Sequence, residues 1–245
     1  MAAPNIVNVT TITGITTFKA GIAVTTVTST ILRAGGYATA ATIRITATDS
    51  LGIAVKGRTI DAVSANSGVV LSGSAACTDA SGYVTDGVYS CTATSAAGSV
   101  SGNSATVTYQ TADPLSTTGG FLTTTQTYTI GGSVATEVIS LHATDLTAKS
   151  TFSPGEAMVV AVTAKDSAGN PVYDGAASPA LSANKLIGGT ASIAAGTYAG
   201  GLFTTRTLSS GVVLRADNFY APVGTGDFKI TGLSGNATAS QISVT

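Results

Sequence analysis

Apolar and polar residues alternate with a period of two along several stretches of this chain. Residues 42–48, TIRITAT, place two isoleucines and an alanine on one side, and threonine or arginine on the other. Residues 104–109, SATVTY, and residues 241–245, QISVT, alternate in the same way. β-Branched residues with this period, separated by Gly, Asn and Asp, are typical of antiparallel strands. Helical spacing is not sustained over any useful window, so the sequence predicts an all-β protein.

One strand–turn–strand segment occurs twice. Residues 43–57, IRITATDSLGIAVKG, and residues 160–175, VAVTAKDSAGNPVYDG, share a strand, an Asp-Ser-x-Gly turn and a second short strand that closes with Gly. The two copies are separated by about the length of one β-sandwich domain, roughly 100 residues. The repetition predicts two domains of the same kind.

The repeated segment has a structural explanation in its turn residues. Asp49 and Asp166 stand where a strand ends, and an aspartate in that position accepts N–H bonds from the backbone two residues on. Gly52 and Gly169 supply the positive φ that such turns require. Pro171 starts the next strand, where its missing N–H matters least. Because the segment occurs in both domains, we expect scaffold turns here and not a catalytic site.

The motif resembles that of bacterial Ig-like domains of the invasin/intimin type. In that family one turn is similar to DSAGNPV and a later one to TDASGYV, both of which occur in this chain. The first copy matches at Asp49, Gly52, Val55, Gly57, Thr78, Asp79, Gly82 and Val84. The second copy matches at Asp166, Gly169, Asn170, Pro171 and Val172, and it lacks a clear TDxxG partner. The resemblance implies tandem Ig-like antiparallel β-sandwiches.

Clusters of Gly, Pro and Ser predict the domain boundaries. Residues 110–120, QTADPLSTTGG, combine Asp-Pro with Gly-Gly, as linkers do. We therefore expect a first Ig-like sandwich at 37–112, a linker at 113–120 and a second sandwich at 121–245. Residues 1–36 are expected to form an N-terminal β arm that anchors the protein or adds to a neighbour's sheet edge.

Charge excludes one class of partner and leaves few candidates for sites. Charged residues make up 9% of the chain, with 11 Lys and Arg against 12 Asp and Glu, where about 25% is usual. No basic face is available for a phosphate backbone, so nucleic acid is not an expected partner. No run of about 18 apolar residues occurs, and membrane insertion is not expected. The opening MAAPNIVNVTTITG has neither a basic nor an apolar region, which predicts that no signal peptide is present.

Calcium is the metal that the acidic residues suggest. Two loops are bracketed by aspartates, Asp79 with Asp86 and Asp166 with Asp174. Calcium takes six to eight oxygen ligands, usually with several carboxylates close together, and each loop offers two. Turn formation explains these aspartates equally well, and no other cofactor is expected.

The two cysteines, Cys77 and Cys91, lie close together in the sequence. They form either a local disulfide or two buried thiols, since one pair does not define the redox compartment. Asp86-Gly87 predicts a hairpin turn. That turn would place Val84 opposite Tyr89 and leave the cysteines out of direct register, which argues against a simple cross-strand disulfide.

Aromatic residues gather in 217–228, DNFYAPVGTGDF. Phe219, Tyr220 and Phe228 form either a contact patch for a sugar or a neighbouring subunit, or a loop whose rings plug the open end of a sandwich. The single histidine, His142, has Ser140 and Asp145 nearby in sequence. No Gly-x-Ser-x-Gly pattern accompanies them, and an enzyme is not expected.

The opening residues are similar to the start of structural proteins from tailed bacteriophages. This resemblance implies a non-enzymatic virion protein that decorates a capsid or tail and assembles in the host cytoplasm. Its expected partners are copies of itself, other virion proteins and host-surface glycans. The alternative is a surface-layer subunit or adhesin at the bacterial cell surface, and a weaker one is a glycan-binding module.

Overall fold

The computed structural model confirms an all-β protein. It describes residues 21–27, 29–49, 51–79, 87–113, 116–209, 212–216, 219–232, 237–238 and 240–244. Strands and turns account for the regular structure in these ranges, which contain no helix and hence none able to cross a membrane. The chain divides into two compact units, Met1–Ile130 and Gly131–Thr245.

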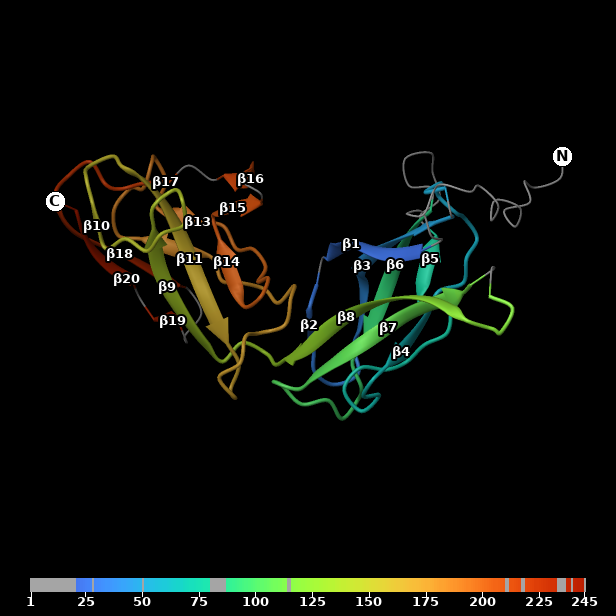
Figure 1. Cartoon of the computed structure of the whole chain (residues 1–245). Helices are drawn as coiled ribbons and strands as arrows, with labels where there is room; N and C mark the ends of the chain where they lie inside the picture. The colour runs from blue at the N-terminus through green and yellow to red at the C-terminus, as the bar shows by residue number, and fades with distance from the viewer. Residues whose placement is uncertain are drawn as a thin grey trace. The chain divides into compact units, whose positions relative to one another are not determined.

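The first unit consists of two four-stranded sheets (Figure 1). One sheet has the order β1-β3-β6-β5, with bounds β1 (Gly21–Val27), β3 (Ala38–Thr48), β6 (Val88–Thr94) and β5 (Cys77–Asp79). The other has the order β2-β8-β7-β4, with bounds β2 (Ile31–Arg33), β8 (Phe121–Gly131), β7 (Ser104–Ala112) and β4 (Asp61–Ser64). Residues from both sheets, among them Ile43, Ile45 and Tyr109, form one buried cluster. The unit is therefore a β-sandwich.

The strand order of this sandwich is that of an Ig-like domain. Ig sandwiches place strands A, B, E and D in one sheet and C, F and G in the other. If β1 is A, then β3, β4, β5, β6, β7 and β8 are B to G, and the two observed sheets are A-B-E-D and G-F-C. The short strand β2 joins the second sheet beside β8. The Ig-like topology of the first unit is thus read directly from the order in which its strands pair.

The second unit repeats this arrangement. One sheet has the order β14-β11-β9-β19, with bounds β14 (Leu202–Thr204), β11 (Ala157–Lys165), β9 (Thr136–His142) and β19 (Ala237–Thr238), and β17 (Phe219–Tyr220) pairs the start of β11. The other has the order β10-β20-β18-β12-β13, with bounds β10 (Thr151–Phe152), β20 (Ser240–Val244), β18 (Gly226–Gly232), β12 (Leu181–Ala183) and β13 (Ser192–Ile193). A hairpin of β15 (Arg206–Ser209) and β16 (Val212–Ala216) stands apart. Strands β9-β11-β14 correspond to β1-β3-β6, and β10-β20-β18-β12 to β2-β8-β7-β4.

The predicted linker at 113–120 is wrong. This segment is the turn between β7 and β8, which pair from Ser104 opposite Thr129 to Ala112 opposite Phe121. The boundary instead falls after Ile130. Asp-Pro and Gly-Gly occur in hairpin turns as well as in linkers, and only the pairing of the flanking strands distinguishes the two.

The predicted N-terminal arm at 1–36 also requires correction. Strand β1 pairs with β3 and strand β2 joins the sheet of β8, so residues 21–33 complete the first sandwich. Thr- and Val-rich strands look alike whether they close their own domain or leave it. Residues 1–20 lie outside the described residues.

The repeated turn has the predicted scaffold chemistry in both units. Asp49 Oδ1 accepts bonds from the backbone N–H groups two and four residues on, each at 2.9 Å. Asp166 Oδ1 accepts the equivalent bonds at 2.9 and 3.0 Å. Gly52 and Gly169 have φ values of 78° and 84°. The prediction that these aspartates organise turns is confirmed.

A glycine lies against each repeated turn. Gly87 O accepts a 2.8 Å bond from Ala47 N, and Gly201 O accepts an equal bond from Ala164 N. A Cβ at Gly201 would lie 2.8 Å from Pro171 Cβ and 3.0 Å from Ala164 O. Because glycine has no side chain, the chain entering β6 can lie close to the end of β3 in the first unit. In the second unit the chain entering β14 can lie close to the end of β11 for the same reason.

Candidate functional site

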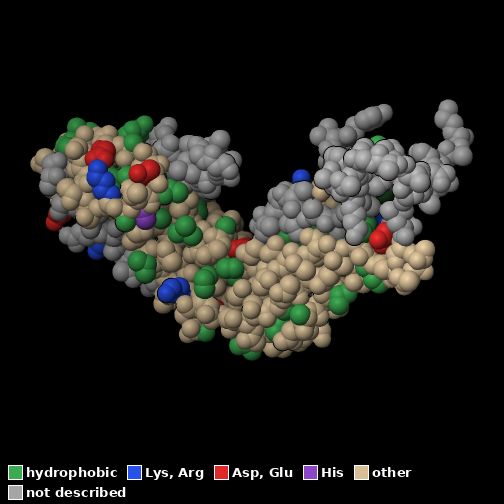
Figure 2. Space-filling view, in the orientation of Figure 1, with side chains coloured by type: hydrophobic (Ala, Val, Ile, Leu, Met, Phe, Trp, Pro, Cys, Tyr) green, Lys and Arg blue, Asp and Glu red, His purple; other side chains and the backbone are tan. Residues whose placement is uncertain are grey.

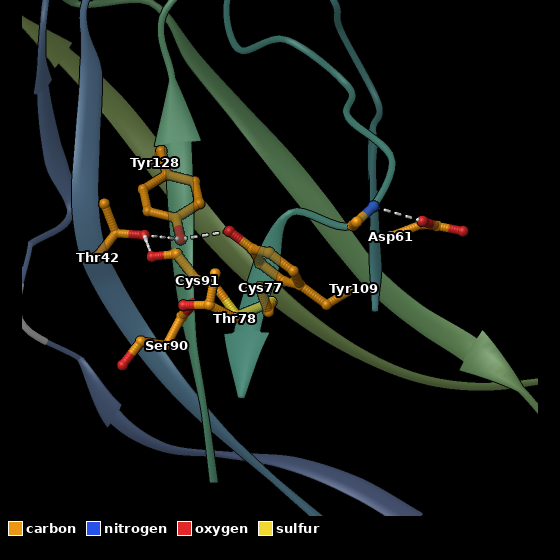
Figure 3. Close-up of a disulfide and its surroundings, with 9 residues drawn as sticks. Thr42, Asp61, Cys77, Thr78, Ser90, Cys91, Tyr109 and Tyr128 are labelled. Carbon is orange, nitrogen blue, oxygen red and sulfur yellow. Dashed lines mark hydrogen bonds between the residues drawn. A yellow bond between two sulfur atoms is a disulfide. The ribbon is translucent and has the colours of Figure 1, made fainter. Parts of the chain in front are cut away.

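A disulfide joins Cys77 on β5 to Cys91 on β6 in direct register, with Cα atoms 3.9 Å apart (Figure 3). Thr92 N donates to Ala76 O at 2.9 Å, which makes the cysteines a non-hydrogen-bonded pair. Side chains approach most closely at such pairs. The pairing of β5 with β6 therefore places the two cysteine side chains next to each other, close enough for the disulfide to form.

The register expected from Asp86-Gly87 is wrong. Tyr89 lies opposite Asp79 and not opposite Val84. The connection from β5 to β6 is longer than a two-residue turn, and the dipeptide pattern alone could not reveal its length. Asp86 and Val84 lie outside the described residues.

A buried hydroxyl network lies beside the disulfide and links the two sheets (Figure 3). The hydroxyls of Tyr109 and Tyr128 are 2.7 Å apart. Thr42 Oγ1 lies 2.9 Å from the Tyr128 hydroxyl and donates to Cys91 O at 3.3 Å. Each of these polar groups has a partner, as buried groups require. The network positions strands β3, β7 and β8 against one another.

Alkaline pH is expected to unfold the first unit cooperatively. Burial raises the pKa of Tyr109 and Tyr128 above the ordinary tyrosine value of 10.0. The unfolded chain releases these protons near pH 10 and the folded chain does not, so stability is complete below that pH and falls as the pH rises above it. The tyrosinate absorbance of Tyr109 and Tyr128, obtained as the difference between the wild type and the Tyr109→Phe/Tyr128→Phe variant, should appear together with the loss of circular dichroism. Ionisation of both tyrosines while the circular dichroism stays native would contradict the expectation.

Of the four calcium candidates the structure describes Asp79, Asp166 and Asp174, which bind backbone groups, while Asp86 lies outside the described residues. Asp79 Oδ2 accepts a bond from Gly57 N at 3.1 Å, and Asp174 Oδ1 accepts one from Gly200 N at 2.6 Å. Asp166 uses both oxygens, because its Oδ2 accepts a 2.9 Å bond from Gly132 N. Within the described ranges, no three His, Cys, Asp or Glu side chains are grouped to hold a metal ion. Asp79, Asp166 and Asp174 thus bind backbone groups of their own turns and of neighbouring loops.

Replacing Asp166 with alanine should lower the free energy of unfolding of the second unit by about 2–4 kcal/mol, since three backbone N–H groups lose a charged acceptor in a nearly buried position. Asp49→Ala is the matched control. That carboxylate accepts two bonds from its own turn and is less buried, so a smaller loss is expected. Denaturant unfolding with and without EDTA measures both effects. A transition of the wild-type chain that EDTA shifts would indicate calcium binding instead.

The three aromatic residues of segment 217–228 lie in two different environments, the buried core and the exposed surface. Phe219 and Phe228 belong to the core of the second unit, with exposed fractions of 8% and 0%. Tyr220 remains 37% exposed on strand β17. A patch of three exposed rings is therefore absent. Two rings fill the sandwich, as the plug alternative expects, and strand alternation turns the third outward.

His142 and Ser140 meet on the outer side of strand β9. Ser140 Oγ lies 2.9 Å from His142 Nε2, and His142 Nδ1 lies 3.0 Å from Leu146 O. A carbonyl only accepts, so Nδ1 carries the proton and Nε2 accepts from Ser140. Asp145 Oδ1 instead binds Thr147 N and Oγ1 at 3.0 and 2.6 Å. The carboxylate needed to complete a Ser–His–Asp triad is engaged within its own turn.

Several large apolar side chains are exposed, and of these the sequence analysis named only Tyr220. Among them are Leu51, Ile53 and Phe121 in the first unit, and Leu186, Tyr220 and Val223 in the second. Their exposed fractions range from 37% to 86%. Most of these residues lie in loops, where no periodicity marks a side chain as outward. Figure 2 shows few charged side chains on the face in view, with apolar side chains scattered over it.

Solved structures similar to this chain include bacterial adhesins. InvE of Yersinia pseudotuberculosis is 15% identical with a TM-score of 0.31, and the match covers 88% of this chain and 56% of that one. FdeC of Escherichia coli is 15% identical with a TM-score of 0.35, with 92% and 62% covered. The D00-D0 domain of intimin is 13% identical with a TM-score of 0.29, with 92% and 98% covered. The chain thus spans about 60% of the two adhesins.

No protein-family model and no curated protein matches the chain. The TM-scores of the similar structures lie below 0.5. The Ig-like topology therefore rests on the strand order of each unit.

Proposed function

We propose that this chain is a non-enzymatic structural module of a bacterial surface protein, of the adhesin or surface-layer kind. The observation that carries the proposal is the buried Cys77–Cys91 disulfide within a duplicated Ig-like framework. Disulfides form in secreted and surface-exposed proteins and are rare in the cytosol. The disulfide thus supports a chain that works outside the cytoplasm.

Burial of the two cysteines favours the cell surface over a virion assembled in the cytoplasm. Cys91 has no exposed surface and Cys77 has 7%. Once the sandwich has folded, oxidants have little access to the sulfur atoms, so the bond forms most readily while the chain folds. Folding in an oxidising compartment provides that condition, and the reducing cytoplasm does not.

A virion structural protein is the second candidate. Its argument is the resemblance of residues 1–14 to the start of phage structural proteins, which rests on that short segment of sequence alone. The low charge of the chain suits either assembly, because contacts through hydroxyl and small apolar groups are hardly screened by salt. The glycan-binding alternative now depends on Tyr220, the exposed ring of the aromatic segment. Loss of glycan-array binding in Tyr220→Ala would support it.

Immunogold electron microscopy of intact producing cells and of purified virions tests the proposal. Antibodies raised against the chain should label the cell envelope. Mass spectrometry of the native protein, alkylated without reduction, should find Cys77 and Cys91 joined. Labelling confined to virions, with both thiols alkylated, would overturn the proposal in favour of the second candidate.

A further inference from the structure

Ser140 and His142 form a hydrogen-bonded pair that the proposed structural role does not use. Both side chains lie on the outer face of β9, because the inward-facing residues Glu137, Ile139 and Leu141 are buried. Ser140 Oγ lies 2.9 Å from His142 Nε2. Residues two apart on one strand share a face, so the strand itself places the hydroxyl beside the imidazole.

The direction of this bond is fixed by the second nitrogen of the ring. His142 Nδ1 lies 3.0 Å from Leu146 O. A carbonyl only accepts, so Nδ1 carries the proton of the neutral ring and Nε2 accepts from the serine hydroxyl. A serine that donates to a histidine oriented by a third group is the arrangement that activates nucleophilic serines. Here a backbone carbonyl takes the place of the usual carboxylate.

The carbonyl that orients His142 comes from a strained turn. Leu146 has φ +69°, a left-handed conformation that is unfavourable for leucine. Its N–H donates to Ala143 O at 3.0 Å, and Ala143 N donates to Thr147 O at 2.8 Å. Asp145 Oδ1 accepts a further bond from Thr147 N at 3.0 Å. Strain of this kind persists only where the surroundings enforce it, and it clusters at functional sites.

The serine hydroxyl is shielded on one side and accessible from the other. Ala161 lies opposite Ser140 and Val159 lies opposite His142, and these two residues of β11 are 2% and 1% exposed. Ser140 and His142 themselves remain partly exposed. Reduced access of water on the β11 side strengthens the hydrogen bond between them. A small molecule in solution can still reach the hydroxyl from the outer side.

Two exposed apolar side chains lie next to the serine on the same face. Val138 precedes Ser140 by two residues and is 50% exposed. Thr163 pairs with Val138 on one side and with Leu202 on the other, which places Leu202, 44% exposed, in the same row across the sheet. An acyl chain attached to the serine can lie over this row. Burial of its methylene groups there favours longer acyl chains over acetyl.

We propose that Ser140 is an acyl-acceptor site, at which the serine hydroxyl takes the acyl group of an activated ester. His142 Nε2 removes the hydroxyl proton while Ser140 Oγ forms a bond to the carbonyl carbon of the ester. The bond from that carbon to the leaving oxygen then breaks, and the leaving alcohol takes the proton back from Nε2. The products are one acylated serine and one alcohol, with no other reactant consumed. This modification goes beyond the proposed structural role.

The transfer is expected to be slow and to stop after one acyl group. The Leu146 carbonyl carries no full charge, so it stabilises the imidazolium less than the aspartate of a hydrolase does. Pairing with β11 engages N–H groups of β9, whereas hydrolases direct free N–H groups at the oxyanion of the intermediate. The general base is then the main source of acceleration, about 100-fold at the low end of the usual range. The site is therefore suited to modification and not to turnover.

Intact-mass spectrometry of the full chain incubated with p-nitrophenyl butyrate tests the proposal. The wild type should gain one butyryl group that hydroxylamine removes, since hydroxylamine cleaves esters and leaves amides on lysine. Peptide mapping should place it on Ser140. His142→Gln should slow the reaction roughly 100-fold, and Ser140→Ala should abolish the ester. Ser182 is the internal control: its hydroxyl pairs with Thr231 Oγ1 at 3.1 Å, away from the chain's single histidine, so it should stay unmodified.

Two further variants separate an activated serine from one that is merely exposed. Val138→Ser should lower the preference for p-nitrophenyl butyrate over p-nitrophenyl acetate severalfold and leave acetylation unchanged. Asp145→Ala loosens the turn that carries the Leu146 carbonyl and should slow the transfer. Asp145→Asn keeps an acceptor oxygen and should restore it. Circular dichroism melts establish that each variant is folded, and the comparison of Ser140 with Ser182 in the wild type requires no variant.

Three results would each overturn the proposal. They are equal butyrylation of Ser140 in the wild type and His142→Gln, ester adducts on Ser182 at the rate of Ser140, and a butyryl group on His142 that persists in Ser140→Ala. A chain that is found on the cell envelope with its disulfide intact and takes no acyl group would overturn this proposal alone. The proposed structural role would then still stand.

Discussion

Gly201→Ala is expected to lower the free energy of unfolding of the second unit by roughly 2–5 kcal/mol. The backbone at Gly201 has φ +74°, which costs an L-residue about 1–2 kcal/mol. The new Cβ would also lie 2.8 Å from Pro171 Cβ and 3.0 Å from Ala164 O, and overpacking of this kind costs about 1–3 kcal/mol. Ala164 lies in strand β11 and Pro171 directly follows the turn that Asp166 organises, so neither atom can move away cheaply. Denaturant unfolding followed by circular dichroism measures the loss.

Gly200→Ala is the matched control for this prediction. Gly200 has φ +62°, and a Cβ there would meet nothing within 4 Å. The expected loss is the backbone part alone, about 1–2 kcal/mol. In the first unit Gly87→Ala should behave as Gly201→Ala does, because its Cβ would lie 2.8 Å from Ala54 Cβ and 2.9 Å from Ala47 O. Equal losses at Gly200 and Gly201 would show that close packing contributes nothing.

Reduction of the Cys77–Cys91 disulfide is expected to lower the stability of the first unit by about 3 kcal/mol. The bond closes a loop with a sequence separation of 14, and a crosslink over about 15 residues restricts the unfolded chain by that amount. It also holds β5, which pairs with β6 at the edge of its sheet in the part of the chain that the structure describes. The measurement is denaturant unfolding of the full chain with and without reductant.

The second unit is an internal control for the reduction experiment. Both cysteines of the sequence lie in the first unit, so the second transition should not move. The Cys77→Ala/Cys91→Ala variant should be unaffected by reductant. A first transition that does not change on reduction would show that the disulfide leaves the folding equilibrium unaltered.

Local chemistry made the fold and its repeated turn predictable. Alternation such as TIRITAT leaves little choice but a strand with one buried face, and β3 has that pattern at Ile43, Ile45 and Ala47. Asp49 and Asp166 satisfy backbone groups within a few residues of themselves. No distant part of the chain is needed for either inference.

Register and burial were not predictable in the same way. Whether Cys77 faces Cys91 depends on the length of the connection between β5 and β6, and a dipeptide such as Asp86-Gly87 does not determine it. Phe219 and Phe228 are buried while Tyr220 is exposed, because each ring follows the face of its own strand. The 113–120 turn differs from a linker only through the pairing of β7 with β8.

By itself, then, the sequence determined the all-β class, the two-fold repetition and the chemistry of the Asp turn, since these depend on neighbouring residues. The tertiary structure decided the disulfide register, the true boundary after Ile130 and which aromatic side chains of 217–228 are buried. Those features depend on which strands pair and how they are connected. Pairing is a long-range property that the residues of one strand do not carry alone.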